Sequence, residues 1–195
     1  MRTFIPKDAK LIPEQMQRVF KGVIFDVYQW QQKMYDGSYA TFEMLKRPDT
    51  VKVIPVKDGK LVVEEQEQPQ LGFFYDFPGG RHDNDAETEL EAVKREMLEE
   101  TGMTFATWKL IRVEQPQSKI DWLVYTFLAT DFIDQKEQHL ESGEKITVTL
   151  KTFSEVKKLL GDPRVRYLAK DVLESLNIID DLLQLPDLLV QNDVA

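Results

Sequence analysis

Glutamates gather in one short acidic segment of the chain, residues 78–103, which holds eight Asp and Glu residues. Glu96, Glu99 and Glu100 crowd together just before Gly102. Like charges on a short segment repel, so the cluster costs stability unless solvent or a bound cation compensates it. Carboxylate oxygens are the ligands that hard divalent cations prefer. The segment is therefore either a well-solvated surface or a cation site.

Apolar spacing predicts that this segment is a helix. Leu90, Val93 and Met97 form one apolar stripe at helical period, and Gly102 suits the residue that follows a helix. At about 100° per residue, the first and last of the three glutamates project within roughly 40° of each other, and the middle one about 60° to the other side of the first. The three carboxylates therefore share one face.

An acidic run on a helix is more often a solvated face than a binding site. Three features of this segment favour a cation site instead. The carboxylates lie near the helix C-terminus, where the macrodipole disfavours negative charge by about 0.3–1 kcal/mol each. Gly79 and Gly80 follow a strand and offer backbone carbonyls near the cluster. Arg95 stands four residues after Glu91 and four before Glu99, and is placed to brace both.

Composition excludes several other classes of site and partner. The 195-residue chain has no cysteine and two histidines, so it has no disulfide framework, thiolate metal site or cysteine nucleophile, and a histidine-rich zinc site is poorly supported. A formal charge of −9 without a basic run argues against nucleic acid as a partner. No stretch approaches the roughly 18–20 apolar residues of a membrane helix, and the first residues lack the apolar core of a signal peptide. We expect a cytoplasmic protein without a membrane partner.

β-structure is predicted on both sides of the acidic helix. Residues 18–46 are rich in β-branched and aromatic residues around a turn at residues 35–38 and predict a hairpin-rich N-terminal element. Asp58-Gly59 is a strong hairpin signal between the next two strands. The predicted strands after the N-terminal element are residues 50–56, 61–66, 70–77, 105–113, 122–130 and 146–153.

Helices are predicted in the last quarter of the chain. Ser154 is expected to cap a short helix that stops at Gly161. Pro163 suits the first turn of a second helix, through about Asn177. Strands, one helix, more strands and then helices indicate the α+β class.

The acidic segment resembles the Nudix box, a motif with the order Gly, five residues, Glu, seven residues, Arg-Glu, an aliphatic residue, any residue, Glu-Glu, any residue, Gly and an aliphatic residue. Glu87, the seven residues TELEAVK and the run REMLEETGM match it in type and spacing. There is one departure, because six residues (RHDNDA) separate Gly80 from Glu87 where the motif has five. The extra residue falls in the loop before the helix, where changes in length are tolerated best.

The resemblance extends to the N-terminal strands, which are similar to those of ADP-ribose pyrophosphatase-type Nudix hydrolases. It implies a Nudix α/β/α sandwich with a mixed sheet, an added N-terminal β-hairpin element and C-terminal helices. The implied units are residues 1–47, a β element that pairs two subunits in a homodimer, residues 48–161, the Nudix domain, and residues 162–195, a helical extension.

The same resemblance implies metal-dependent hydrolysis of the pyrophosphate bond in a nucleoside diphosphate linked to another group, such as ADP-ribose or another nucleotide sugar. Mg²⁺ is the implied cation, with Mn²⁺ as the alternative. Two other functions stay open: a clean-up hydrolase of modified nucleoside triphosphates, and a catalytically silent nucleotide-sugar sensor. The implied metal ligands are Glu96, Glu100, Glu99 and the carbonyl of Gly79, and the implied structural supports are Arg95, Glu87, Gly80 and Gly102.

The general base is expected, by the same resemblance, on a loop before a late strand. Glu144 is the first candidate there and Glu141 the second, and an ordinary polar turn around Gly143 is the alternative for both. Glu99 is the remaining candidate, as in other branches of the family.

Substrate contacts are less well defined by the sequence. The related enzymes carry Arg-Gln-Tyr-Arg on a strand before the box, where this chain has acidic and amide residues at 65–68. Arg81 and Lys119 could replace that positive charge, and His82 is expected to be a loop residue without a catalytic task. Four aromatic residues could stack on a base, although each is more often part of a core: Tyr28, Trp30, Phe74 and Trp122.

Overall fold

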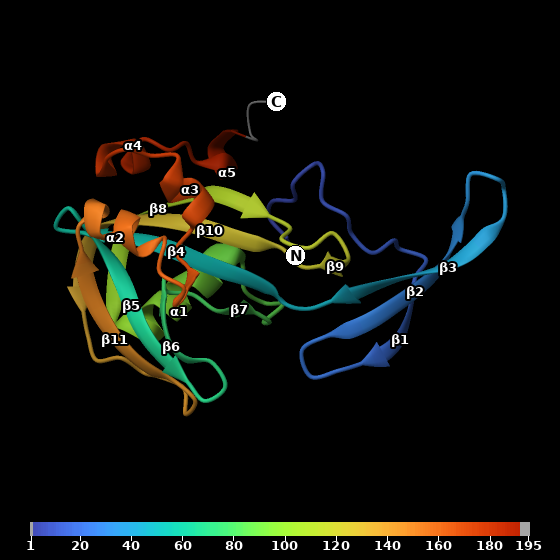
Figure 1. The fold of residues 1–195 in the computed structure, drawn as a ribbon, viewed down its shortest axis with the longest axis horizontal. Helices are drawn as coiled ribbons and strands as arrows, with labels where there is room; N and C mark the ends of the chain where they lie inside the picture. The colour runs from blue at the N-terminus through green and yellow to red at the C-terminus, as the bar shows by residue number, and fades with distance from the viewer. Residues whose placement is uncertain (1, 192–195) are drawn as a thin grey trace.

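A computed structural model describes residues 2–191 and consists of two sheets and five helices within that range. In Figure 1 the strands of the N-terminal sheet extend away from a larger body that carries the helices. The predicted α+β class is confirmed. The strands are β1 (Gln17–Lys21), β2 (Asp26–Lys33), β3 (Tyr39–Lys46), β4 (Asp49–Lys57), β5 (Lys60–Gln68), β6 (Gly72–Asp76), β7 (Arg81–His82), β8 (Met103–Glu114), β9 (Ile120–Asp121), β10 (Val124–Gln135), β11 (Lys145–Lys151) and β12 (Val165–Tyr167), and the helices are α1 (Glu89–Thr101), α2 (Phe153–Leu159), α3 (Lys170–Glu174), α4 (Ile179–Leu183) and α5 (Leu188–Gln191).

The body is built on a mixed sheet with the order β12-β6-β5-β4-β10-β8. β4 and β10 run parallel, and β8 joins β10 antiparallel. β11 also pairs with β5, and the short β7 pairs with the start of β4. Because β7 follows the glycine pair directly, this pairing holds the glycines against the edge of β4.

Two apolar cores lie on opposite faces of this sheet. β4 supplies both, because side chains alternate along a strand: Val51 and Val53 pack with α1, whereas Ile54 and Val56 pack with the C-terminal helices. This is the expected arrangement of helices on both sides of a mixed sheet. No helix among residues 2–191 is long and apolar enough to cross a membrane.

The N-terminal sheet has the order β1-β2-β3-β9. The predicted hairpin is confirmed: β2 and β3 pair antiparallel along their whole length, and Gly37 takes a positive φ of 86° in the turn between them. β9, a short strand that the sequence did not indicate, pairs with the end of β3 and ties this sheet to the body.

The C-terminal quarter differs from its prediction in two places. The cap of α2 is Thr152 and not Ser154, because Thr152 and Glu155 form a reciprocal capping box. The second predicted helix, from Pro163 to Asn177, was wrong. In its place β12 pairs parallel with β6, and only Lys170–Glu174 is helical. The open edge of β6 accounts for this difference, since Tyr75 and Phe77 donate their backbone N–H groups to carbonyls of this segment.

Candidate active site

Helix α1 carries the acidic cluster and has well-defined ends. Thr88 and Glu91 form a capping box at its start, and Gly102 ends it in the left-handed conformation, with φ 71° and its N–H donated to Leu98. Val93 and Met97 are fully buried. The predicted helix and its Gly102 terminus are confirmed. The expected bridge from Arg95 to Glu91 is absent from the ion pairs of the described residues, because Glu91 takes part in the cap.

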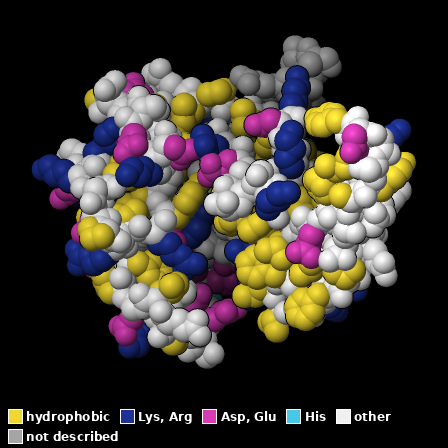
Figure 2. Space-filling view, turned by 45° about the vertical axis from the view of Figure 1, so that its right-hand side comes forward, with side chains coloured by type: hydrophobic (Ala, Val, Ile, Leu, Met, Phe, Trp, Pro, Cys, Tyr) yellow, Lys and Arg dark blue, Asp and Glu magenta, His cyan; other side chains and the backbone are white. Residues whose placement is uncertain are grey.

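A cavity of about 950 Å³ opens beside α1. Figure 2 shows a hollow between the body and the N-terminal sheet, with basic and acidic side chains inside it. Both glycines after β6 line the cavity. From β7, the loop after it and the helix, the cavity is lined by Arg81, Asp83, Asn84, Glu87, Arg95, Glu96 and Glu100.

Arg95 holds three of the glutamates together. Its Nη1 donates to Glu96 Oε1 at 3.0 Å and to Glu99 Oε2 at 3.1 Å, and its Nε lies 3.3 Å from Glu87 Oε1. This is the bracing that the spacing of Arg95 and Glu99 suggested, extended to the start of the helix. The guanidinium offsets the repulsion that the crowded carboxylates would otherwise suffer.

Glu100 is the most enclosed glutamate of the helix cluster, at 5% exposed, and it joins the helix to the glycine pair. Its Oε2 accepts a hydrogen bond from the backbone N–H of Gly79 at 2.6 Å. Gly79 has φ 137°, and a Cβ there would lie 2.1 Å from the carbonyl oxygen of Val51. A Cβ at Gly80 would meet the Glu96 carboxylate at 2.5–2.7 Å. Glycine at both positions therefore lets the carboxylates approach the backbone.

A buried polar network behind the cavity was missed by the sequence analysis. Lys52 Nζ donates to Asp76 Oδ2 at 2.9 Å and to the carbonyl of Phe77 at 2.9 Å. Glu64 is fully buried, and its Oε2 accepts from Gln66 Nε2 at 2.6 Å. The available signal was charge within strands: Lys52 interrupts an otherwise apolar run, and Asp76 follows three aromatic residues.

The carboxylates beside α1 are held in an environment that disfavours their charge. Burial raises the pKa of Glu96, and burial followed by the neighbouring Glu64 raises the pKa of Glu100 well above its usual value. Burial also raises the pKa of Glu64 to about 8. A cation among these groups would offset both the burial and the mutual repulsion.

The donor set fits a hard divalent cation. Glu96 and Glu100 line the cavity. Behind it, Glu64 Oε1 is buried without a hydrogen-bond partner among the described residues, and the charge of Glu64 acts on Glu100. Carboxylate and backbone oxygens suit Mg²⁺ or Mn²⁺. Residues 2–191 contain no group of three or more acidic or histidine side chains already arranged around a common point. One oxygen of each helix glutamate is engaged, since Arg95 donates to Glu96 and Glu99 and the Gly79 N–H donates to Glu100.

The two loop glutamates considered as the base lie in the turn before β11. Glu141 and Glu144 both line the cavity. Two hydrogen bonds join these residues. The Glu144 N–H donates to the Glu141 carbonyl at 3.0 Å, and the Glu141 N–H donates to Glu144 Oε2 at 3.2 Å. Glu99 is outside the cavity lining and faces Arg95. The choice of base stays a prediction.

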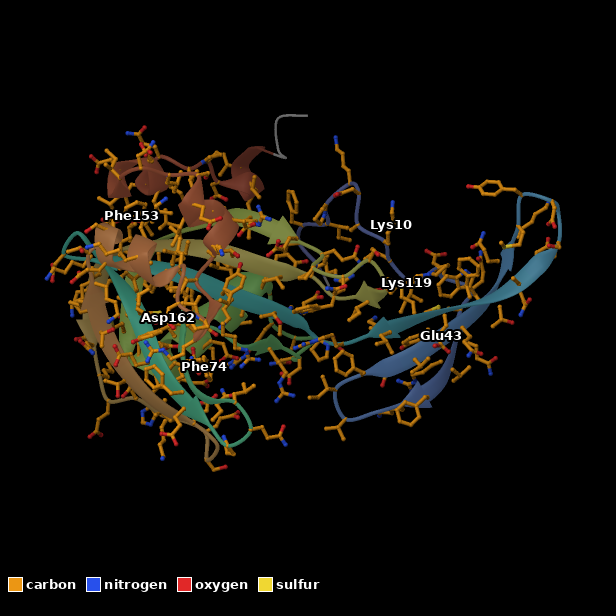
Figure 3. The ribbon with its side chains drawn as sticks, viewed as in Figure 1. Lys10, Glu43, Phe74, Lys119, Phe153 and Asp162 are labelled. Atoms are coloured by element: carbon orange, nitrogen blue, oxygen red, sulfur yellow. The ribbon has the colours of Figure 1, made fainter. Side chains whose placement is uncertain are left out.

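The candidate substrate contacts fall into different places. Arg81 and Trp122 line the cavity, whereas Tyr28 and Trp30 lie on β2 in the N-terminal sheet, outside the lining. Lys119 also lies outside it, and its Nζ is 5.2 Å from the ring centroid of Phe42. In Figure 3 Lys119 is seen near the N-terminal sheet, apart from Phe74 on β6. Phe74 is buried at 5% exposed. His82, expected in a loop, lies on β7, and its Nε2 is 2.8 Å from the Glu87 carbonyl.

Taken together, the fold and the site define an α+β protein with a carboxylate-lined cavity beside the capped helix α1. A family model described as NUDIX domain matches residues 46–172. The chain belongs to the NUDIX domain family.

Two known proteins are similar to the chain over most of its length. An ADP-ribose pyrophosphatase of Bacillus subtilis (strain 168) is 28% identical over 153 residues, covering 76% of this chain and 82% of the relative. A crystal structure of an ADP compounds hydrolase superposes with a TM-score of 0.69 at 19% identity, covering 92% of this chain and 97% of that one. The second similarity concerns the fold.

Proposed function

We propose that this protein hydrolyses the pyrophosphate bond of a nucleoside diphosphate linked to another group, with a nucleotide sugar such as ADP-ribose as the substrate. The observation that carries the proposal is the position of Glu96 and Glu100 on the wall of a cavity of about 950 Å³, where the charge of the buried Glu64 acts on Glu100. Family membership and the B. subtilis relative named ADP-ribose pyrophosphatase support the same reaction.

Glu96, Glu100 and Glu99, with the carbonyl of Gly79, would hold the cation, for which Mg²⁺ is the first choice and Mn²⁺ the second. When bound, a divalent cation neutralises pyrophosphate oxygens and activates the attacking water. Arg95 keeps the glutamates of the helix in position through the contacts described above, and Glu87 connects that brace to the start of the helix. Neither of these two residues moves a proton in the proposal.

Glu144 is the proposed base, which would accept a proton from the attacking water. Its place in the cavity lining and on a loop, rather than in the helix, supports this role. Glu141 is the second candidate in the same turn. Glu99 is the third, and its engagement with Arg95 disfavours it.

We also propose that residues 1–47 pair two subunits in a homodimer, beside a Nudix domain at residues 48–161 and an extension at residues 162–195. Large apolar side chains are exposed on the N-terminal sheet: Phe20 is 60% and Val23 99% exposed. Light scattering of Phe20→Ser should report a monomer at a concentration where the unmodified chain is a dimer. Ile133→Ser, at an exposed apolar residue of β10, is the control.

Turnover on a substrate panel tests the proposed reaction. The panel contains ADP-ribose, UDP-glucose, GDP-mannose, dinucleoside polyphosphates and modified deoxynucleoside triphosphates, with Mg²⁺ and coupled detection of phosphate. Glu100→Gln should abolish turnover, whereas Glu174→Gln, at an exposed helix residue paired with Lys170, should not.

Each result of the panel has a defined meaning. Turnover of a diphosphate sugar that Glu100→Gln removes supports the proposal. Preference for modified triphosphates would replace it with the clean-up reaction. Tight binding of a nucleotide sugar by calorimetry with no turnover would replace it with the sensor.

A further inference from the structure

The C-terminal end of α1 lies against the loop that connects β10 to β11, residues 136–144. The last four carbonyl groups of an α-helix have no partner within the helix. In α1 the first of these four accepts a hydrogen bond from the N–H of Gly102, which ends the helix. The other three carbonyls belong to Glu99, Glu100 and Thr101, and each needs a donor from another part of the chain.

All three donors come from residues 135–139, where β10 ends and the loop begins. The donor–acceptor pairs are the His139 N–H with the Glu99 carbonyl at 2.8 Å, Gln138 Nε2 with the Glu100 carbonyl, and Gln135 Nε2 with the Thr101 carbonyl at 3.4 Å. The loop therefore completes the hydrogen bonding of the helix end that carries the acidic cluster. Donors at a helix C-terminus also offset part of the macrodipole, which disfavours negative charge there.

Gly102 allows the loop to approach the helix this closely. Its carbonyl accepts from the N–H of Lys136 at 2.9 Å. A Cβ at Gly102 would overlap the carbonyl group of Lys136, so a side chain there would push the loop away. The glycine thus ends the helix and also leaves room for the backbone of the loop.

Gln138 also connects the helix end to the far side of the loop. Besides the contact with Glu100, its Nε2 lies 3.5 Å from the carbonyl oxygen of Ile146, near the start of β11. The segment between Gln138 and Ile146 contains Glu141 and Glu144, the two loop candidates for the base. Their turn is closed by hydrogen bonds within itself, so its position relative to the helix depends on how the two ends of the loop are held.

We propose that Gln138 is a positioning residue for the reaction, which holds the loop of Glu141 and Glu144 at a fixed distance from the carboxylates of α1. Glu100 lines the cavity while its own carbonyl accepts from Gln138, so one residue joins the proposed metal site to the proposed base loop. A base acts only within hydrogen-bond reach of the proton it accepts, and a displacement of about 1 Å can cost about 10²-fold in rate. The inference rests on the proposed function for this chemistry, whereas the contact itself can be tested without it.

Gln138→Leu removes the amide donor and keeps a side chain of similar size. Its kcat on the substrate identified by the panel should fall about ten-fold or more, because the base loop loses its fixed position. KM and the calorimetric affinity for Mg²⁺ should stay nearly unchanged, since Arg95 and Gly79 hold the helix carboxylates through contacts of their own. A general loss of structure would instead change all three quantities.

Two further variants separate positioning from ordinary helix capping. Gln138→Lys should recover most of the lost kcat, because an ammonium group also donates to the last carbonyls of a helix. Gln135→Leu is the matched control, since it removes an amide that donates to the same helix end from an exposed residue of β10; it should turn over as the unmodified chain does. An unchanged kcat in Gln138→Leu, or an equal loss in Gln135→Leu, overturns the positioning role.

Amide hydrogen exchange tests the contact without substrate or metal. The His139 N–H is bonded to the Glu99 carbonyl, so its exchange should become faster in Gln138→Leu and stay unchanged in Gln135→Leu. Circular dichroism checks each variant, and Gln138→Glu, which keeps the shape without the donor, replaces Gln138→Leu if that variant fails to fold. Unchanged exchange at His139 with normal turnover overturns the inference and leaves the proposed function intact. Faster exchange with no turnover by the unmodified chain on any substrate overturns the proposed function and supports the docking of the loop by Gln138.

Discussion

The ammonium nitrogen of Lys52 lies 2.9 Å from Asp76 Oδ2 and 2.9 Å from the carbonyl oxygen of Phe77, with both charged side chains buried. Asp76 also accepts from the backbone N–H of Phe77 at 2.8 Å. These contacts tie β4 to the end of β6, from which the chain passes into Gly79 and the cavity beside α1. The pair thus anchors the strand end that Glu100 contacts.

Lys52→Met should strongly destabilise the fold. It leaves the Asp76 carboxylate buried without its cation, for which a cost of about 3–5 kcal/mol is typical. Urea unfolding followed by circular dichroism measures the free energy of unfolding. Lys145→Met is the control, because its pair with Glu67 at 3.4 Å is exposed and should contribute at most about 1 kcal/mol. Similar losses in both variants would contradict the anchoring role.

Gly79→Ala should disrupt the strand end. Its φ of 137° and a Cβ position 2.1 Å from the Val51 carbonyl oxygen leave no room for a side chain. The free energy of unfolding should therefore fall by at least about 1–3 kcal/mol. Thermal unfolding gives the comparison with Gly161→Ala, whose Cβ would meet its nearest atom at 3.9 Å. An unchanged melting temperature for Gly79→Ala would show that the backbone there relaxes freely.

Glu144→Gln should lower kcat by roughly 10²–10⁴-fold, the range typical of a lost general base, with a smaller change in KM. Glu141→Gln should have a lesser effect, and Glu137→Gln, at an exposed residue of the preceding loop, should have none. Single-turnover rates on the substrate identified by the panel provide the measurement. A larger loss in Glu99→Gln with an unchanged affinity for Mg²⁺ would move the base to the helix.

A divalent cation should raise the melting temperature of the unmodified chain. Burial raises the pKa of Glu96 and of Glu100, so a bound cation relieves a cost already present in the fold. At a concentration 100 times the Kd, binding adds about 2.7 kcal/mol to the free energy of unfolding. Differential scanning fluorimetry in Mg²⁺ and in EDTA measures this for the unmodified chain and for Glu100→Gln.

The control for that shift is Glu174→Gln, which should respond to Mg²⁺ as the unmodified chain does. An equal shift in Glu100→Gln would place the cation elsewhere in the molecule.

The sequence by itself determined the acidic helix and its C-terminal end. The stripe of Val93 and Met97, the Gly102 terminus and the position of Arg95 beside Glu99 are relations between residues a few positions apart, which helical geometry defines locally. The hairpin around Gly37 was predictable for the same reason. The local sequence was misleading at the start of α2, because Thr152 and Ser154 are both suitable N-cap residues. The reciprocal hydrogen bonds between Thr152 and Glu155 make Thr152 the cap.

Only the tertiary structure decided which distant residues share the cavity. β12 replaced a predicted helix because the edge of β6 offers backbone donors that the local sequence does not reveal. That pairing brings Arg166 to the cavity of Arg47 and Arg81, and strand pairing likewise places Lys52 against Asp76. Contacts of this kind depend on sheet order and on burial, which act across long separations in sequence, so no spacing within the chain could have indicated them.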